Sequence, residues 1–139
     1  HVCFAAKPVT YGGVERIYYM GGNGPHSGER NSSLGLAVLR RDGFASVRGT
    51  GNLTTVDLKV AASTLRLTVD VFTDDAYVQL YSVNDTRVDA QQIRANVTDA
   101  QVDDLDLSSY LGLYVHLTFQ LRDAALYTLA FSSESAVVH

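Results

Sequence analysis

The stretch from Thr64 to Val71, TLRLTVDV, decides the fold. Its apolar residues alternate with polar ones, and this period of two is typical of a β-strand with one buried and one exposed face. The stretch from Leu113 to Leu121, LYVHLTFQL, has the same period. The residues expected to point inward are Leu65, Leu67, Val69 and Val71 in the first strand, and Leu113, Val115, Leu117, Phe119 and Leu121 in the second.

Shorter strand patterns separated by turn residues fill most of the remaining chain, and no segment has a helical period. These strands are expected over 14–20, 35–41, 44–48, 54–60, 76–83, 92–97 and 125–131. The dipeptide Asp42-Gly43 predicts a hairpin between its two flanking strands. Further turns are expected at 49–52 and at 84–85, and one helical turn within 107–111. Regularly spaced short strands predict an all-β fold, an antiparallel β-sandwich of jelly-roll-like type.

The first thirteen residues, HVCFAAKPVTYGG, predict an extended N-terminal arm. Pro8 and the Gly12-Gly13 pair argue against a helix, and the apolar residues follow no clear period. These apolar residues are Val2, Phe4 and Val9. The expected organisation is an arm over 1–13 and a single β-sandwich domain over 14–139. The single cysteine, Cys3, lies in the arm. It is a buried or incidental thiol, one half of an intermolecular disulfide, or the partner of a cysteine elsewhere in a longer chain.

Composition excludes several classes of protein. The 139 residues are 46% hydrophobic, which favours a packed core over global disorder. The net charge is −4 and only two residues are lysines, so no basic stripe is present for a nucleic acid. No apolar run approaches the ~18–20 residues of a membrane helix. The chain begins at His1 without a signal peptide, so we expect a processed chain or part of a longer one.

Four of the five asparagines begin an N-x-S/T sequon, the acceptor motif for N-glycosylation. They are Asn31, Asn52, Asn84 and Asn96. Ser and Thr are frequent enough that chance predicts only about 0.8 sequons from five asparagines. All four lie beside turn-forming residues, where an acceptor is exposed. The sequons therefore predict a secreted, extracellular glycoprotein that has passed through a eukaryotic secretory route.

No arrangement of residues predicts catalysis, and no catalytic residue, cofactor or metal is expected. The four histidines, His1, His26, His116 and His139, lack zinc-ligand spacing, and His116 is expected at a solvated surface. No nucleophile elbow occurs, and Cys3 has no evident histidine partner. The acidic residues of two loops are read as solvated turn residues, with a structural Ca²⁺ site as the weaker alternative. These acidic residues are Asp74, Asp75, Asp103, Asp104 and Asp106.

Three stretches resemble a known family. They are IYYMGGNGPHSGER at 17–30, GLAVLRRDGFASV at 35–47 and the closing segment 115–127, whose last part is DAALY. Together they resemble the C-terminal β-sandwich of secreted proteins related to five-bladed β-propeller glycoside hydrolases, over about residues 14–131. The RRDGF stretch is the most specific part of this resemblance. The resemblance implies a β-sandwich in an extracellular carbohydrate context, and it implies that His26 braces a loop.

The chain departs from that family because it lacks the propeller that carries the glycosidase carboxylates. No catalytic residue of the family can therefore be assigned to this sequence. What the resemblance implies is an accessory or packing module, not an enzyme.

Two functions are open on this basis. The first is a non-catalytic structural module that assembles with neighbouring copies, and can form a filament, through an arm that carries Val2, Cys3, Phe4 and Val9. The alternative is a carbohydrate-binding accessory module, in which Tyr77, Tyr81 and Tyr114 form an aromatic platform for sugar rings. The structural module is the favoured interpretation. Its expected partners are copies of itself or another extracellular domain, with covalent N-glycans and without nucleic acid or membrane.

Overall fold

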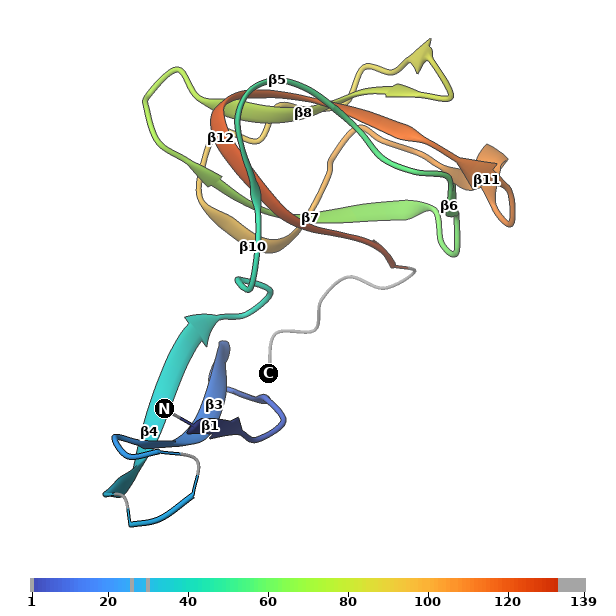
Figure 1. Cartoon of the computed structure of the whole chain (residues 1–139). Helices are drawn as coiled ribbons and strands as arrows, with labels where there is room; N and C mark the ends of the chain where they lie inside the picture. The colour runs from blue at the N-terminus through green and yellow to red at the C-terminus, as the bar shows by residue number, and fades with distance from the viewer. Residues whose placement is uncertain (1, 26, 30, 133–139) are drawn as a thin grey trace. The chain divides into compact units, whose positions relative to one another are not determined.

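The computed structural model describes residues 2–25, 27–29 and 31–132 and has an all-β fold built from antiparallel sheets (Figure 1). The chain divides into two compact units, His1–Phe44 and Ala45–His139. We call them the N-terminal unit and the C-terminal unit. No helix in the described part of the chain is long and apolar enough to cross a bilayer.

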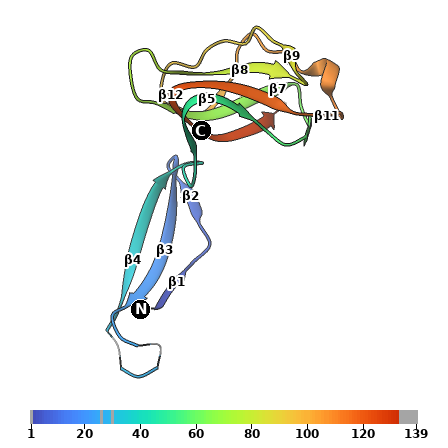
Figure 2. The same ribbon diagram turned by 45° about the horizontal axis from the view of Figure 1, so that its top comes forward.

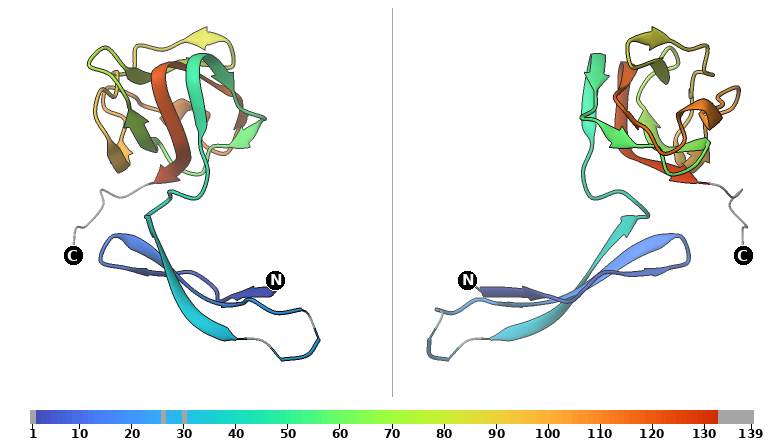
Figure 3. Two further views of the ribbon diagram at one scale, coloured as in Figure 1. Left: turned by 60° about the vertical axis from the view of Figure 1, so that its left-hand side comes forward. Right: turned by 90° about the vertical axis from the view of Figure 1, so that its right-hand side faces the viewer.

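The N-terminal unit is a twisted antiparallel sheet (Figure 3). Its strands are β1 (Val2–Ala5), β2 (Val9–Tyr11), β3 (Val14–Gly22) and β4 (Ser32–Arg40). Strand β3 is central, and β4 pairs with it over its whole length, from Val14 opposite Arg40 to Gly22 opposite Ser32. Strands β2 and β1 pair with the first and last parts of β3. β4 therefore forms one edge of this sheet, and β1 with β2 forms the other.

The expectation of a separate N-terminal arm over 1–13 is therefore corrected. Both apolar segments of that stretch are strands that pair with β3 of the same chain, and the boundary between units falls after Phe44 rather than after residue 13. Gly12 and Gly13, at φ of 61° and 74°, form the two-residue turn that joins β2 to β3. Positive φ at both central residues is the geometry of a type I′ hairpin turn, which glycine adopts without strain.

The C-terminal unit contains the β-sandwich (Figure 2). Its strands are β5 (Val47–Thr54), β6 (Leu58–Lys59), β7 (Thr64–Val71), β8 (Tyr77–Val83), β9 (Thr86–Arg87), β10 (Val97–Gln101), β11 (Tyr114–Val115) and β12 (Leu117–Ser132). One 3-10 turn, Ser108–Tyr110, confirms the helical turn expected within 107–111. The main sheet has the order β10-β7-β12-β8-β9, β5 also pairs with β12, and β6 pairs with β11.

Strand β12 joins the two layers of the sandwich. Its first part, Leu117–Arg122, pairs with β8, and its second part, from Ala124, pairs with β7. Strand β5 pairs with both parts on the other edge of β12. The change of partner falls at Asp123, which has a φ of 42° and interrupts the register with β5. This bulge lets a single 16-residue strand pass from one layer to the other.

The hydrophobic core lies between β7 and β8 and is covered by β12. Its fully buried members include the inward set predicted for β7, namely Leu65, Leu67 and Val69, and most of the set predicted for 113–121, namely Val115, Leu117, Phe119 and Leu121. Val71 packs on this core from a half-buried position. Leu113 was wrongly placed in the core, since it lies before β11 in the turn that follows the 3-10 segment and is exposed.

Several predicted turns and strand boundaries are wrong, because they depended on local signals alone. The strands expected over 44–48, 54–60 and 92–97 do not match β5, β6 and β10. Asp42-Gly43 does form a turn, in which the Gly43 N–H donates to the Arg40 carbonyl, but the next strand pairs with β12 and no hairpin results. The expected turn at 49–52 lies inside β5, where Gly49 and Gly51 have φ of 154° and 144°. The strand expected over 125–131 is the second part of β12.

Candidate functional site

The four sequon asparagines are all exposed and lie on four separate segments of the chain. Asn31 directly precedes β4, Asn84 lies in the turn between β8 and β9, and Asn96 directly precedes β10. Asn52 lies within strand β5 and not in the turn expected there. An N-glycan needs an exposed acceptor, so each position is compatible with glycosylation. The four residues remain predicted acceptors.

The side chains of two of these asparagines are held by the backbone of a neighbouring segment. The Oδ1 atom of Asn84 accepts a hydrogen bond from the His116 N–H at 3.0 Å. The Oδ1 atom of Asn96 accepts one from the Val71 N–H at 2.8 Å. The amide nitrogen, to which an N-glycan is joined, takes no part in these bonds. The fold therefore orients both asparagines through Oδ1, and the side-chain nitrogen stays available for the glycan.

His116 lies between two aspartates. Its Nδ1 is 3.7 Å from a carboxylate oxygen of Asp57 and its Nε2 is 3.3 Å from one of Asp85. The His116 side chain is 29% exposed, so the expected solvated position is corrected to a half-buried one between the β5–β6 connection and the β8–β9 turn. Both contacts become ion pairs when the imidazole is protonated. The arrangement braces the β8–β9 turn, which carries Asn84.

The three tyrosines of the predicted carbohydrate platform come from two different strands. Tyr77 and Tyr81 lie on the outer face of β8, whereas Tyr114 lies in β11, which pairs with β6. The guanidinium of Arg94 lies 5.3 Å from the Tyr77 ring centroid, and that of Arg87 lies 5.3 Å from the Tyr81 ring centroid. The Tyr77 hydroxyl also donates to Gln120 Oε1 at 3.0 Å. The Tyr77 and Tyr81 rings therefore both contact side chains of the same protein.

The loop carboxylates lie in two connections of the C-terminal unit, one between β7 and β8 and one between β10 and the 3-10 turn. Among the residues described, no group of three or more His, Cys, Asp or Glu side chains is placed to hold a metal ion. Asp106 has a local role, because its Oδ1 accepts hydrogen bonds from the Ser108 N–H at 2.8 Å and the Ser108 hydroxyl at 2.5 Å. This carboxylate therefore holds the first residue of the 3-10 turn.

Replacing Ser108 with alanine is expected to raise the pKa of Asp106 toward its ordinary value of 3.8. The side-chain hydrogen bond from Ser108, and then its backbone hydrogen bond, lower that pKa in the folded protein. A depressed pKa contributes stability above the unfolded-state pKa, and this contribution is lost as the pH falls through the folded-state pKa. An NMR titration of the Asp106 carboxyl carbon in wild type and Ser108→Ala measures the change. An unaltered midpoint would contradict the assignment.

The residues predicted for the arm lie in two different strands, β1 and β2. The backbones of Val2, Cys3 and Phe4 belong to β1 and pair with Gly22, Gly21 and Met20 of β3. Val9 belongs to β2, is exposed and pairs with Arg16. Strand pairing within the chain already uses the segment that was expected to reach a neighbour. His26 lies outside the described residues.

The N-terminal unit presents an apolar face that the sequence did not reveal. Directly paired residues of an antiparallel sheet point to the same face, so the register of β3 and β4 places their exposed apolar side chains together. The exposed apolar members of this face are Val9, Tyr11, Tyr18, Met20, Leu34, Leu36 and Val38. Arg16, which pairs with Val9 and Val38, lies on the same face, with its guanidinium 4.9 Å from the Tyr11 ring centroid. Alternation in β4 was hidden because Gly35, Ala37 and Leu39, on the opposite face, are also nonpolar.

Comparison with protein-family models, with curated proteins and with solved structures found no match. The resemblance to the sandwich of propeller glycoside hydrolases therefore stays a prediction from the sequence.

Proposed function

We propose that this protein is a non-catalytic, extracellular, N-glycosylated structural module that assembles with copies of itself through its N-terminal unit. The apolar face of that unit is the observation that carries the proposal. Leu34 is 76% exposed and Val38 is 55% exposed, with Leu36 between them on the same strand. Contiguous exposed apolar side chains on a folded unit are typical of an interaction surface. The extracellular and glycosylated parts of the proposal rest on the four sequons.

The edge strand β4 supports a second copy as the occupant. Among the described residues β4 pairs only with β3, so one edge of this nine-residue strand faces away from the sheet. Such an edge is a template for an added strand. An antiparallel partner β4 centred on Leu36 places Leu36 opposite the same residue of the second copy and Leu34 opposite its Val38. The apolar face then continues across both copies.

Charge is compatible with the same register. Arg40, at the end of β4, falls opposite Ser32 of the second copy, so no two like charges are brought directly opposite each other within the strand. Like charges at directly opposite positions destabilise a strand pair, and their absence here favours this register. The contact is symmetric, because each copy supplies the same strand.

The second edge of the N-terminal sheet provides a route to longer assemblies. β1 and β2 pair with one side of β3, and among the described residues neither pairs with another strand. A sheet that is extended at both edges does not close on itself, so it propagates. The structural module is therefore proposed to form a filament when both edges are used. This route replaces exchange of a separate arm, because β1 and β2 are already paired with β3.

The substitution Leu36→Lys is expected to weaken self-association by at least about tenfold in Kd. The change places a charge at the centre of the β4 edge and of the apolar face. Sedimentation velocity of the secreted, glycosylated full chain measures the effect over a range of concentrations. Wild type is expected to show species larger than the monomer, and Leu36→Lys to shift them toward the monomer.

Val56→Lys is the matched control, since Val56 is an exposed apolar residue of the C-terminal unit. It introduces the same charge outside the proposed surface and is expected to associate as wild type does. A wild-type protein that stays monomeric at the highest concentration, or a Leu36→Lys variant that associates unchanged, would overturn the proposal.

A further inference from the structure

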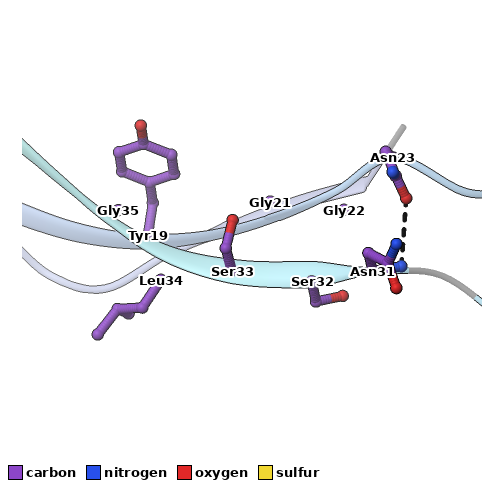
Figure 4. Close-up of a pocket in the computed structure, with 9 residues that line it drawn as sticks. All are labelled: Tyr19, Gly21, Gly22, Asn23, Asn31, Ser32, Ser33, Leu34 and Gly35. Atoms are coloured by element: carbon purple, nitrogen blue, oxygen red, sulfur yellow. Dashed lines mark hydrogen bonds between the residues drawn. The ribbon is translucent and has the colours of Figure 1, made fainter.

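We infer that an N-glycan on Asn31 is seated on the protein, with its first sugars lying in a trough on the N-terminal sheet and against the ring of Tyr19. The inference rests on the proposed glycosylation and adds to it a binding site for the attached sugar. The trough has a volume of about 560 Å³ and lies within the N-terminal unit, between the ends of β3 and β4 (Figure 4). This volume falls within the range of small-ligand sites, about 300–1,000 Å³.

The floor of the trough is made of small residues. Gly21 pairs with Ser33 and Tyr19 pairs with Gly35, so these four residues share one face of the sheet. Figure 4 shows the Tyr19 ring and the Ser33 hydroxyl standing on the same side of the two strands. With two glycines and one serine beside it, the Tyr19 ring is the only large side chain among these four residues. The trough is therefore bounded at one end by an aromatic ring.

The Tyr19 ring leans across its partner strand. A Cβ atom built on Gly35 would lie 2.4 Å from Tyr19 Cζ and 2.7 Å from its hydroxyl oxygen, so only glycine permits this position of the ring. The ring covers Gly35 and is itself 38% exposed. An aromatic ring that lies over its neighbour and is still open to solvent offers an apolar platform with a polar tip.

Asn31 is held at the other end of the trough. Its N–H donates to Asn23 Oδ1 at 3.2 Å, and its carbonyl accepts from the Asn23 N–H at 3.2 Å. Four residues of extended strand separate Asn31 from Gly35, about 13 Å. The first few sugars of an N-glycan span such a distance. The attachment point and the ring therefore lie at opposite ends of one trough.

The chemistry of the trough fits a sugar. A pyranose ring has an apolar C–H face that packs on an aromatic ring, and hydroxyl and amide groups at its edge that form hydrogen bonds. Tyr19 offers the first kind of contact, while Ser33 and the amide of Asn23 offer the second. A mostly apolar surface with a few placed polar groups is the usual composition of a small-ligand site.

Two further hollows in the C-terminal unit support the association of sequons with concave surface. One is lined by residues 47–53 and Leu121 and includes Asn52. The other includes Asn96 beside Phe72 and Arg94. Three of the four sequon asparagines thus border a hollow.

The position of the trough also agrees with the proposed assembly. Four of its lining residues, Tyr19, Gly21, Ser33 and Gly35, lie on the face of the N-terminal sheet opposite Leu36 and Val38, because neighbouring residues of a strand point to opposite faces. Leu34 also borders the trough, but its side chain points to the other face (Figure 4). A glycan seated in the trough covers one face and leaves the apolar face bare.

The test is the rate at which an amidase removes the Asn31 glycan from the native full chain, measured by glycopeptide mass spectrometry. Tyr19→Ala is expected to increase this rate by at least about threefold, since it removes the ring against which the sugar packs. Gly21→Val is expected to act in the same direction, because a Cβ at Gly21 meets no atom within 4 Å and the valine would fill the trough without strain. This second variant separates loss of the seat from loss of folding.

Tyr114→Ala is the matched control, because Tyr114 is an exposed tyrosine of the C-terminal unit, outside both the trough and the apolar face. At a concentration where sedimentation shows monomer only, its Asn31 glycan is expected to be removed at the wild-type rate. Equal rates in wild type, Tyr19→Ala and Gly21→Val would show that the Asn31 glycan does not pack in the trough, and would leave the proposed glycosylation unaffected. An Asn31 without glycan in denatured wild-type protein would overturn the proposed modification as well.

Discussion

The substitution Phe119→Ala is expected to lower the free energy of unfolding of the C-terminal unit by about 3–5 kcal/mol. Phe119 is the largest of the fully buried side chains. It lies in the part of β12 that pairs on both edges, opposite Leu53 of β5 and Leu80 of β8. Truncation therefore leaves a cavity between two layers that strand pairing holds apart, and the walls can collapse only in part. Urea unfolding followed by far-UV circular dichroism measures the loss, since the chain has no tryptophan.

Phe72→Ala is the control for this prediction. The Phe72 ring is exposed, and the guanidinium of Arg48 lies 3.7 Å from its centroid. Removing the ring forfeits a cation–π contact of about 0.5–1 kcal/mol at an exposed site and creates no cavity. Equal loss of stability in the two variants would show that Phe119 does not occupy the core described here.

The burial of Phe119 follows from the sequence, and so does that of most residues on its face. A period of two requires only that successive side chains point to opposite sides, which is a local property of an extended chain. For this reason Leu65, Leu67 and Val69 were assigned correctly without knowledge of their partners. Leu113 was not, because the alternation begins before the strand does.

Strand partners could not be predicted in the same way. β5 pairs with β12 across more than sixty residues of sequence, and neither strand has a sequence feature that identifies its partner. Gly49 and Gly51 resemble turn residues in the sequence, but they lie in β5 opposite the bulge of β12 at Asp123. There the Thr50 hydroxyl accepts a hydrogen bond from the Asp123 N–H at 2.9 Å. A glycine signals an unusual φ, which a turn and a bulged strand both require.

The candidate sites also differ in whether they depend on local sequence or on strand pairing. Sequons are contiguous motifs, so all four were found in the sequence. The trough beside Asn31 depends on the register that brings Gly21 to Ser33 and Tyr19 to Gly35. The apolar face depends on that register too, since it joins residues of β2, β3 and β4. Neither surface has a signature along the chain.

Disrupting the contact between Arg66 and Asp99 is expected to lower the free energy of unfolding by about 2–3 kcal/mol. Arg66 lies on the polar face of β7 and was expected to be exposed, but its side chain is 10% exposed and that of Asp99 is 24% exposed. The Arg66 Nε donates to Asp99 Oδ1 at 2.9 Å, and its Nη2 also donates to the Asp99 carbonyl. Breaking a buried pair costs about 3–5 kcal/mol, and the partial exposure of Asp99 reduces that figure.

The backbone at Asp99 explains why the pair matters to the fold. Asp99 has a φ of 52° and lies in the bulge where β10 shifts its register on β7. Its N–H donates to the Thr68 hydroxyl at 3.0 Å, and Thr68 is fully buried. Arg66 and Thr68 therefore hold Asp99 through its side chain, its carbonyl and its N–H, which fixes the bulge of β10 against the edge of β7.

A double-mutant cycle separates the pair from its surroundings. Arg66→Met keeps much of the apolar stem, and Asp99→Asn keeps a residue that tolerates positive φ, so neither change adds backbone strain of its own. The coupling free energy from urea unfolding of the two single variants and the double variant is expected to be about 1–2 kcal/mol. Additive losses would show that each residue acts separately. A substantial coupling would mean that β10 is held on β7 by a polar pair, because the apolar face of β7 is already occupied by the core.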